Sequence, residues 1–509
     1  MRVRIPIVLT LVWLATLQPG GVAWSAEEWS PVADGIGFQE FWLPGPNRAF
    51  VARMDRSRPN LIVDSLLAQG KLYEGIEGVS GMALRQDNSV IPWDGSWNAL
   101  GQVVVAINGI FYDPSTGVPE TGMIQSGWYI KRFDDLGGGS GCAWKSDASA
   151  FIGGCAYHQR DRQLISFINR GTKMEILGIN VGQSSDGIVI FTPQYDAHTH
   201  TSDGGVEVVV EMLQPAGIYP APRMSTGYIR SIRNGAGSTP IPFDHLVISA
   251  RGEAGRKLLE NSGIGDRVGV SQEITHLLSA DCQTPDERDW TLTFASIGGS
   301  FNFLADSEIR SFDDNLGAVA RNPRTVVCFN DDFLYFVVVD GRQSGYSIGM
   351  TTDELGAFCR DSLGAEWGIN QDGGGSSTMW VNGRVVNRPS DGQERAVANG
   401  LAMLVLEPLD RSNVFLPGDP IQTVGETAVR LGPGDNYGVI ATVPQDEGGL
   451  ILPHLGGLNG VFARGTYWWK VAFAGTQGWV AQDDIFGGTI WAGNLKSVHD
   501  KLLRIWDDR

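Results

Sequence analysis

The chain has 509 residues, of which 42% are hydrophobic and 19% are charged, so its length allows several folded domains with a sizeable core. Its formal net charge of −18 excludes a general nucleic-acid binder, because no basic excess is available to displace counterions from phosphates. Glycine occurs 67 times. That frequency is about twice the average and indicates many tight turns in a β-rich fold.

The first 26 residues have the pattern of an export signal. Arg2 and Arg4 precede an apolar stretch that runs from Ile5 to Leu17, and small residues follow it. We therefore expect residues 1–26 to be a signal peptide and the mature protein to be secreted, periplasmic or in the cell envelope. No later stretch has the roughly eighteen consecutive apolar residues of a membrane span, so no transmembrane anchor is expected.

The cysteines and histidines limit which disulfides, metal sites and cofactors the sequence predicts. Five cysteines follow the signal, at positions 142, 155, 282, 328 and 359. Export permits disulfides, and Cys142 with Cys155 could close a small glycine-rich loop. The odd count leaves at least one free thiol or an intermolecular bond. His198 and His200 have no further ligands nearby in the sequence, so neither a metal nor another cofactor is predicted.

In chain order, apolar runs predict strands and helices separated by glycine-rich turns. β-branched and aromatic runs predict strands at 61–65, 103–107, 187–191, 206–212, 245–250, 291–297, 326–330, 333–339, 379–381, 384–386 and 400–406. Helices are predicted at 80–84, 253–260 and 351–363, the last with a capping box between Thr351 and Glu354. The expected class is α+β: a β-rich, mixed-sheet catalytic domain with a few helices at 27–407, a linker at 408–424, a small all-β barrel at 425–487 and an amphipathic helix at 488–509.

Three predicted strands end directly in polar side chains. Asn108, Asp340 and Asp372 each follow an apolar run, and strand ends are where open sheets tend to hold ligands. We expect Asp372 and Asp340 to be the catalytic carboxylates and Asn108 with Gly109 to contact the substrate. A hairpin turn would also explain the Asn108-Gly109 pair.

Asp372 opens a loop of three glycines and three hydroxyl side chains. The glycines let a ligand approach the bare backbone, and their amides could form an anion-binding nest to which the hydroxyls add donors. The candidate binding residues in this loop are Gly373, Gly374, Gly375, Ser376, Ser377 and Thr378. An exposed turn would have the same composition, so the loop alone leaves both interpretations open.

Three arginines flank the same strand ends. Arg324 precedes a strand, whereas Arg342 and Arg388 follow strands, each beside a turn-forming residue. A guanidinium offers a planar fork to a pair of phosphate oxygens. Together with the carboxylates, the arginines predict a substrate that carries a phosphate and a neutral sugar. Cleavage between an anomeric carbon and a phosphodiester oxygen releases a stable anion, so charge neutralisation matters more than proton donation and one carboxylate can suffice.

These residues also resemble the phosphodiester glycosidase family. The resemblance covers residues 45–407 and rests on Asn108-Gly109-x-Phe111, Asn322-Pro323-Arg324-Thr325, Val338-Val339-Asp340-Gly341-Arg342, Asn370-x-Asp372-Gly373-Gly374-Gly375-Ser376-Ser377-Thr378 and Asn387-Arg388-Pro389-Ser390. It implies hydrolysis of a sugar-1-phosphodiester, such as an N-acetylglucosamine-1-phosphodiester, with release of the sugar. The export signal favours a cell-wall or exopolysaccharide glycan phosphate as substrate. Ile110, Tyr112 and Gln371 depart from the family pattern and bear on substrate fit more than on the carboxylates.

Residues 425–487 resemble a bacterial SH3-like domain. The resemblance rests on Val429-Arg430-x-Gly432-Pro433-Gly434 and on Gly478-Trp479-Val480. It implies contact with peptidoglycan or another wall component. The alternative is a small barrel that only packs against the catalytic domain.

Two other functions remain open at this point. The chain could be a non-catalytic glycan-binding protein that uses both domains to hold the cell wall. It could also be a glycosidase that acts on glycans without phosphate. Binding without turnover would favour the first, and dispensable arginines would favour the second.

Overall fold

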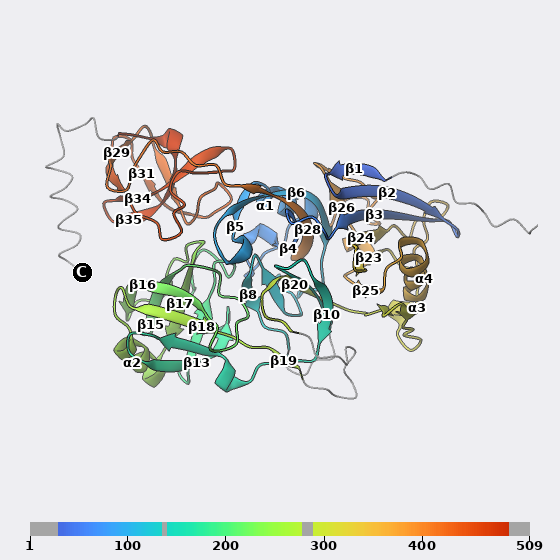
Figure 1. Ribbon diagram of the computed structural model, residues 1–509, viewed down its shortest axis with the longest axis horizontal. Coiled ribbons are helices and arrows are strands. Elements are labelled where there is room, and N and C mark those ends of the chain that lie inside the picture. The colour runs from blue at the N-terminus through green and yellow to red at the C-terminus, as the bar shows by residue number, and fades with distance from the viewer. Residues whose placement is uncertain (1–28, 135–139, 277–288, 488–509) are drawn as a thin grey trace, which may run out of the picture.

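Figure 1 shows the computed structural model, which describes residues 29–134, 140–276 and 289–487. The described chain is β-rich with few helices, as the sequence predicts. No helix within these ranges is long and apolar enough to cross a membrane. The expected signal peptide at 1–26 and helix at 488–509 lie outside the described residues.

Two mixed-order sheets form the part of the molecule that carries the candidate site. The first has the order β1-β2-β3-β24-β23-β25-β21-β22, and the second has the order β27-β26-β6-β28-β4 with β5 paired on β6. The strands of the first sheet are β1 (Ser30–Ala33), β2 (Ile36–Leu43), β3 (Asn47–Asp55), β21 (Leu304–Ala305), β22 (Glu308–Ile309), β23 (Arg324–Phe329), β24 (Phe333–Val339) and β25 (Trp367–Asn370). The strands of the second are β4 (Leu61–Leu67), β5 (Ser89–Ile91), β6 (Ala99–Asn108), β26 (Met379–Val381), β27 (Arg384–Val385) and β28 (Asn399–Pro408).

Apolar residues on the two sheets share one core. Ile107 of β6 and Met403 of β28 lie in the same buried cluster as Phe336 of β24 and Ile369 of β25. Strands β6 and β24 are rich in β-branched residues, and β24 also carries aromatic ones, which suit a pleated surface that is buried. The sheets therefore fix the strand ends at which the polar candidates occur.

Helix α4 (Thr352–Leu363) packs on the first sheet through a second cluster that includes Leu355 and Phe358. The predicted capping box between Thr351 and Glu354 is present, and the helix ends at Gly364 in the left-handed conformation that glycine adopts without strain. The other helices are α1 (Val79–Gln86), α2 (Gly252–Asn261) and α3 (Leu316–Val319), with short 3₁₀ turns at Ala68–Gly70, Trp93–Gly95, Arg160–Arg162, Gly374–Ser376 and Gln482–Asp484.

A closed barrel lies between β11 and β19 in the sequence and was not predicted. Its order is β12-β13-β14-β17-β15-β16-β18. The strands are β12 (Leu164–Phe167), β13 (Thr172–Ile179), β14 (Ile188–Phe191), β15 (Val206–Met212), β16 (Ser225–Asn234), β17 (His245–Ala250) and β18 (Arg267–Ser271). A smaller sheet, β10-β9-β20-β7-β8, lies between the barrel and the two sheets, and β11 pairs with β19. These strands are β7 (Met123–Gln125), β8 (Trp128–Lys131), β9 (Ser140–Lys145), β10 (Ala150–Gly154), β11 (Ala156–Tyr157), β19 (Thr275–His276) and β20 (Thr293–Gly299).

The C-terminal module is a separate all-β unit. Its sheet has the order β31-β30-β35-β34-β32-β29-β36, with β33 paired on β34. The strands are β29 (Pro420–Thr423), β30 (Thr427–Arg430), β31 (Val439–Val443), β32 (Gly448–Ile451), β33 (Val461–Ala463), β34 (Thr466–Phe473), β35 (Thr476–Ala481) and β36 (Ile485–Gly487). Strand β29 falls inside the interval expected to be a linker.

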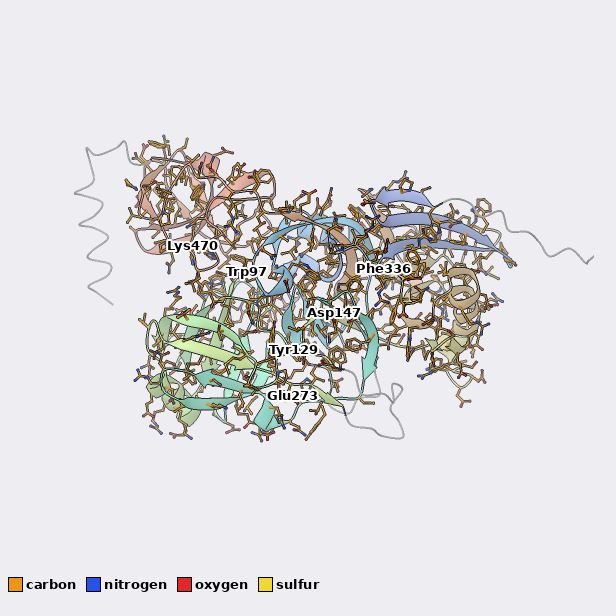
Figure 2. The ribbon with its side chains drawn as sticks, in the orientation of Figure 1. Trp97, Tyr129, Asp147, Glu273, Phe336 and Lys470 are labelled. Atoms are coloured by element: carbon orange, nitrogen blue, oxygen red, sulfur yellow. The ribbon has the colours of Figure 1, made fainter. Side chains whose placement is uncertain are left out.

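The module packs against the barrel. Leu458 and Trp479 of the module share a buried cluster with barrel residues such as Ile248, and Figure 1 shows the module beside the barrel. In Figure 2, Lys470 lies on the side of the module that faces the barrel.

The state of the cysteines contradicts one expectation from the sequence, the pairing of Cys142 with Cys155. Cys142, Cys328 and Cys359 are free and buried, whereas Cys155 is disulfide-bonded. A Cys142–Cys155 bond is therefore wrong. The strand register explains why, because Cys142 on β9 lies opposite Ile152 on β10, three residues before Cys155.

Candidate active site

Asn108 joins three of the segments that carry the predicted site. Its side-chain oxygen accepts hydrogen bonds from Thr325 Oγ1 at 2.7 Å and from the Thr378 amide at 3.1 Å. Its Nδ2 donates to the Asp372 carbonyl at 2.8 Å. The side chain is fully buried, so its amide is engaged within the protein. Asn108 thus positions the glycine loop against β6 and β23.

Packing leaves no room for a side chain at Gly109. A Cβ atom at this position would lie 2.1 Å from Asn399 Oδ1 and 2.3 Å from Ile297 Cδ1. Its carbonyl accepts the Asp372 amide at 2.9 Å, and its amide donates to the Asn399 carbonyl at 2.9 Å. The bare backbone therefore lets β6 and β28 approach the start of the glycine loop.

Asp372 is partly exposed, and its carboxylate accepts a side-chain hydrogen bond from Ser376 Oγ at 2.5 Å, to Oδ2, and a backbone hydrogen bond from Gly373. Burial raises the pKa of Asp372 above its ordinary value, although the Ser376 bond and the charge of Arg395 oppose that rise. The carboxylate is thus partly desolvated and retains acceptor capacity. These are properties of a group that can contact a substrate.

The backbone amides of the glycine loop are largely engaged within the protein. Gly374 donates to the Pro323 carbonyl at 3.0 Å, and Ser377 donates to the Gly374 carbonyl at 3.3 Å. The loop therefore presents fewer amides than an anion-binding nest needs. By contrast, Ser377 Oγ and Thr378 Oγ1 are buried and have no hydrogen-bond partner among the described residues. Unsatisfied buried hydroxyls are costly and mark a place where a bound ligand or water would complete the site.

Asp340 is more enclosed than Asp372. It is 1% exposed, and its carboxylate accepts hydrogen bonds from Asn387 Nδ2 at 2.9 Å, from the Arg388 amide at 2.9 Å and from Tyr346 OH at 3.2 Å. Burial raises the pKa of Asp340 to about 6 in spite of these three donors. Asp340 therefore orders the segment that begins at Asn387.

Asn387 connects the two carboxylates to one network. The same Nδ2 atom also donates to the Ser377 carbonyl at 3.0 Å, and its Oδ1 accepts the Met379 amide at 2.8 Å. Asp340 is thereby linked through Asn387 to the loop that begins at Asp372. The structure brings both predicted carboxylates into a single hydrogen-bonded assembly.

Arg324 has a different position from the other two arginines. It is 4% exposed, and its Nη2 donates to the carbonyls of Gly317, Ala318 and Ala320 at the end of α3. Burial lowers the pKa of this guanidinium to about 10. These contacts attach Arg324 to the backbone around α3, and a further bond joins its Nε to the Met350 carbonyl.

Arg342 and Arg388 are exposed. The Arg342 guanidinium lies against Gly374, where a Cβ atom would come within 3.1 Å of Nη1, and it donates to Asn322 Oδ1 at 3.0 Å. The Arg388 guanidinium lies 5.3 Å from the centre of the Tyr346 ring. Among the described residues, neither arginine forms an ion pair. Two cations at the site are therefore available to an anion.

Several residues of the assembly were not singled out from the sequence. Asp391 and Arg395 form an ion pair at 2.6 Å, and a Cβ at Gly375 would collide with both. Tyr112 and Tyr346 each lie close enough to a site aspartate for its charge to raise the tyrosine pKa beyond the effect of burial. Asn387 lay inside a recognised motif and could have been found, and Tyr112 was noted as a departure from the family pattern, whereas Tyr346 carried no pattern.

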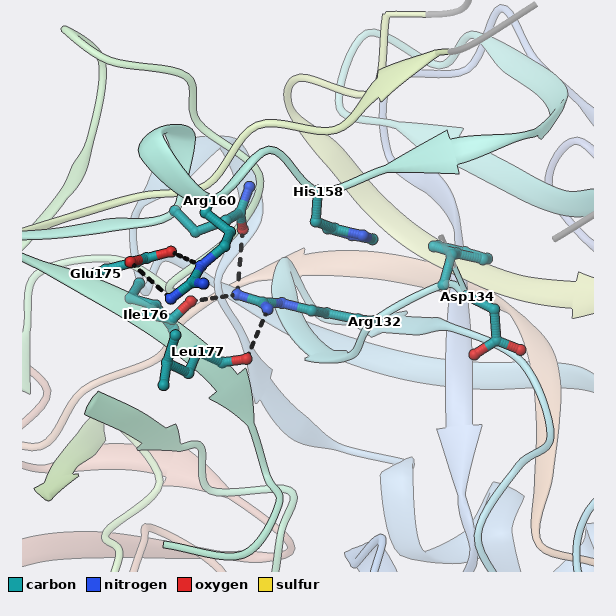
Figure 3. Close-up of a pocket in the computed structure, with 9 residues that line it drawn as sticks. Arg132, Asp134, His158, Arg160, Glu175, Ile176 and Leu177 are labelled. Carbon is teal, nitrogen blue, oxygen red and sulfur yellow. Dashed lines mark hydrogen bonds and ion pairs between the residues drawn. The ribbon is translucent and has the colours of Figure 1, made fainter. Parts of the chain in front are cut away.

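Two hollows of the described chain lie at or beside the barrel. One, of about 310 Å³, is shown in Figure 3 and is lined by Arg132, His158 and the Arg160–Glu175 ion pair. A second, of about 400 Å³, is lined by Tyr195, His200 and Arg251 among others. Neither includes a residue predicted for the site.

Part of the chain matches a known family model. Residues 243–404 match the model of the phosphodiester glycosidase family. The match contains Arg324, Asp340, Asp372 and Arg388 but not Asn108. The comparison with curated proteins gives no match.

Solved structures give distant similarities. A hypothetical protein from Synechocystis has a TM-score of 0.46 and 16% identity over 73% of this chain, which spans 62% of that protein's length. A candidate exported protein from Burkholderia pseudomallei has a TM-score of 0.43 and 18% identity over 70% of this chain and 74% of its own.

A named enzyme is also among the similar structures. The catalytic domain of zebrafish N-acetylglucosamine-1-phosphodiester alpha-N-acetylglucosaminidase, auto-inhibited by its pro-peptide, has a TM-score of 0.33 and 14% identity, with 72% of this chain and 81% of its own covered. Because these TM-scores and sequence identities are low, the function proposed below rests on the family match and on the site itself.

Proposed function

We propose that this protein is an exported glycosidase that hydrolyses a sugar-1-phosphodiester bond and releases the sugar. The observation that carries the proposal is the arrangement around Asp372, a partly buried carboxylate with a raised pKa whose glycine loop lies against the Arg342 guanidinium. The family match over residues 243–404 supports the same reaction class. Both the carboxylate and the cation are needed for a substrate that joins a sugar to a phosphate.

In the proposed reaction, the bond between the anomeric carbon and the phosphodiester oxygen breaks. Water supplies the hydroxyl group that the sugar gains and a proton, and the phosphate leaves as a monoester. Asp372 acts at the anomeric carbon or on the attacking water, and Arg342 with Arg388 neutralises the leaving phosphate. The hydroxyls of Ser377 and Thr378, which have no hydrogen-bond partner in the described part of the chain, hold oxygen atoms of the substrate.

Asp340, Asn108 and Arg324 are positioning residues in this proposal. Each has its polar atoms engaged by the protein: Asp340 by three donors, Asn108 by four bonds and Arg324 by backbone carbonyls. Asp340 fixes the Asn387–Arg388 segment that presents one of the two cations. The glycan is expected to be a cell-wall or exopolysaccharide phosphate, with the C-terminal module, as an SH3-like domain, in contact with the wall.

The test compares two substrates that differ only in the phosphate. One is an aryl phosphodiester of N-acetylglucosamine-1-phosphate, and the other is the aryl glycoside of N-acetylglucosamine. We expect wild type to prefer the phosphodiester, Asp372→Asn to lose about 10²- to 10⁴-fold in kcat, and Arg342→Ala to lose activity on the phosphodiester alone. Arg384→Ala, an exposed arginine on β27, is the matched control. Equal turnover of the two substrates, or full activity in Asp372→Asn, would refute the proposal.

A further inference from the structure

The hollow of about 400 Å³ at the barrel shares no residue with the proposed hydrolytic site. Two connections of the barrel form it, the one that follows β13 and the one that follows β14, together with a residue just after β17. Its volume lies in the range of about 300–1,000 Å³ that small-ligand pockets have. We call it the barrel pocket. Its lining includes Gln183, Tyr195, Thr199, His200, Thr201 and Arg251.

Aromatic rings contribute part of the lining of the barrel pocket. Tyr195 and His200 line it, and Tyr195 lies edge-on to the imidazole at 6.1 Å between ring centres. The Tyr73 ring stacks on the same imidazole, with the centres 5.2 Å apart and the planes at 28°. A hydrogen bond of 2.7 Å joins His200 Nε2 to Asp196 Oδ2. The His200 side chain nevertheless remains 43% exposed, so it offers a ring held in a fixed orientation to a ligand.

A buried carboxylate holds the threonine hydroxyls of the lining. Glu207 of β15 is fully buried, and among the described residues no cation pairs with it. It accepts hydrogen bonds from Thr199 Oγ1 at 3.2 Å and from Thr201 Oγ1 at 2.8 Å. Ser249 Oγ donates to it as well, at 3.0 Å. Because an ionised carboxylate can only accept, the threonine hydroxyls give their protons to Glu207. Toward a ligand, these hydroxyls can therefore only accept a hydrogen bond.

The arginine of the barrel pocket is engaged by the protein. Arg251 Nη2 donates to the carbonyls of Ser202 and Asp203, at 2.7 Å and 2.8 Å. Its Nε donates to Gln183 Oε1. A bound phosphate or carboxylate needs free donors, ideally on a cation. The lining offers acceptors instead, with the negative charge of Glu207 behind them. It therefore disfavours an anion and favours a neutral ligand that is rich in hydroxyl donors.

A sugar ring matches both halves of this lining. One face of a pyranose carries C–H bonds, which are attracted to the negative face of an aromatic ring. Its hydroxyl groups donate to acceptors such as Thr201 Oγ1. We propose that the barrel pocket binds a neutral pyranose without cleaving it, with His200 as the ring platform. This proposal does not depend on the proposed hydrolysis, because the two sites have no residue in common.

The test is a saturation-transfer NMR titration of the full chain with four probes, the methyl glycosides of glucose, mannose, galactose and N-acetylglucosamine. We expect at least one probe to bind with a Kd of about 1 mM, as the size of the ligand allows. His200→Asn removes the ring but suits the left-handed backbone at this position, where φ is 52°. It should weaken that binding about tenfold. His200→Phe keeps a ring and should retain most of the affinity.

Two controls locate the bound sugar. Ile264→Asn changes an exposed side chain in the connection between α2 and β18 and should leave the affinity unchanged. Asp372→Asn should also leave it unchanged, because Asp372 is not part of the barrel pocket. In the aryl phosphodiester assay, His200→Asn should keep the turnover of wild type.

Absence of saturable binding by all four probes would overturn the barrel pocket as a sugar site. Binding that His200→Asn leaves intact, or that Asp372→Asn abolishes, would place the sugar elsewhere and overturn it as well. Titration with inorganic phosphate tests the charge of the ligand: phosphate binding that His200→Asn weakens would indicate an anion site and refute the neutral sugar. Since binding is measured without turnover, these outcomes decide the proposal even if the proposed hydrolysis fails.

Discussion

At the scale of single residues, the two aspartates that follow strands have unequal surroundings. Asp340 is almost fully enclosed and accepts three hydrogen bonds, whereas Asp372 is partly exposed and accepts one side-chain bond, from Ser376. An enclosed carboxylate with all its neighbours donating is satisfied when ionised, so its charge orders those donors. Both residues are aspartates that follow a strand, so only their surroundings distinguish the roles that we propose for them.

The pH dependence of activity should report the ionisation of Asp340. Its pKa is raised to about 6 by burial, and the Tyr346 hydroxyl opposes this rise by donating to Oδ2. Since ionised Asp340 holds the Arg388 segment, kcat/KM should increase as pH rises through about 6. Tyr346→Phe removes a donor that stabilises the charged form, so the rise should move to higher pH. A rise in Tyr346→Phe at the wild-type pH, measured with the phosphodiester substrate, would contradict this role for Asp340.

At the scale of elements, strands dominated by β-branched residues were predictable. The expected bounds of β15 and β24 agree with the structure, because Val206–Met212 is buried along its whole length and Phe333–Val339 at every position after Phe333. The β2–β3 hairpin was missed. Its first strand is only partly buried at nearly every position, so its sequence shows neither a continuous apolar run nor a clean alternation.

The barrel was missed for a different reason. Three of its strands were predicted singly, but closure depends on pairings between distant segments, such as β12 with β18. Turn residues and local periodicity carry no information about such partners. The same limit applies to Arg324, whose sequence position beside a strand suggested a phosphate ligand. Its direction is set by the carbonyls of α3, which only the folded chain brings near.

The junction between β6 and the glycine loop should be intolerant of a side chain at position 109. In Gly109→Ala the new Cβ would come within 2.1 Å of Asn399 Oδ1, and Asn399 is itself bonded to the Ile110 backbone in both directions. Overpacking of this kind costs about 1–3 kcal/mol of unfolding free energy. Because the Gly109 carbonyl also holds the Asp372 amide, kcat should fall as well.

Gly171→Ala provides the control for this substitution, since no atom lies within 4 Å of a Cβ at that position. Its positive φ of 67° adds backbone strain that Gly109 does not have, so any comparison underestimates the packing effect. Denaturant unfolding measures the stability change, and the phosphodiester assay measures kcat. A Gly109→Ala protein with wild-type stability and turnover would show that the junction is loosely packed.

At the scale of the whole molecule, the barrel and the C-terminal module meet at a buried charged cluster. Glu211 and Asp244 come from the barrel side, and His454 and Lys470 come from the module. Although the carboxylates and His454 have ligand atoms within 4.8 Å of one another, Lys470 and Arg230 already neutralise Glu211 at 3.0 Å and 2.6 Å. The cluster therefore suits an ion-pair network between the two units, and we assign no metal to it.

Removal of Lys470 should loosen the attachment of the module. Lys470→Met leaves Glu211, which is 4% exposed, with a single cation, and an incompletely paired buried charge costs about 3 kcal/mol. We expect a lower unfolding temperature for the module in calorimetry at neutral pH. Glu211→Gln combined with Lys470→Met should recover part of the loss. Arg256→Met breaks exposed ion pairs on α2 and should leave the transition unchanged.

The same cluster determines how the stability contributed by Lys470 should change with pH. Burial alone would raise the pKa of Asp244 and of Glu211, but His245 beside Asp244 and Lys470 beside Glu211 hold both values below the ordinary 3.8 and 4.5. Stability from carboxylates with lowered pKa values is present above the unfolded values and is lost as the pH falls through the folded ones. The difference between wild type and Lys470→Met should therefore be full at neutral pH and should shrink as the pH falls below about 4.5. A difference that stayed constant from neutral to acidic pH would show that Lys470 acts through packing of its aliphatic stem instead of through its charge.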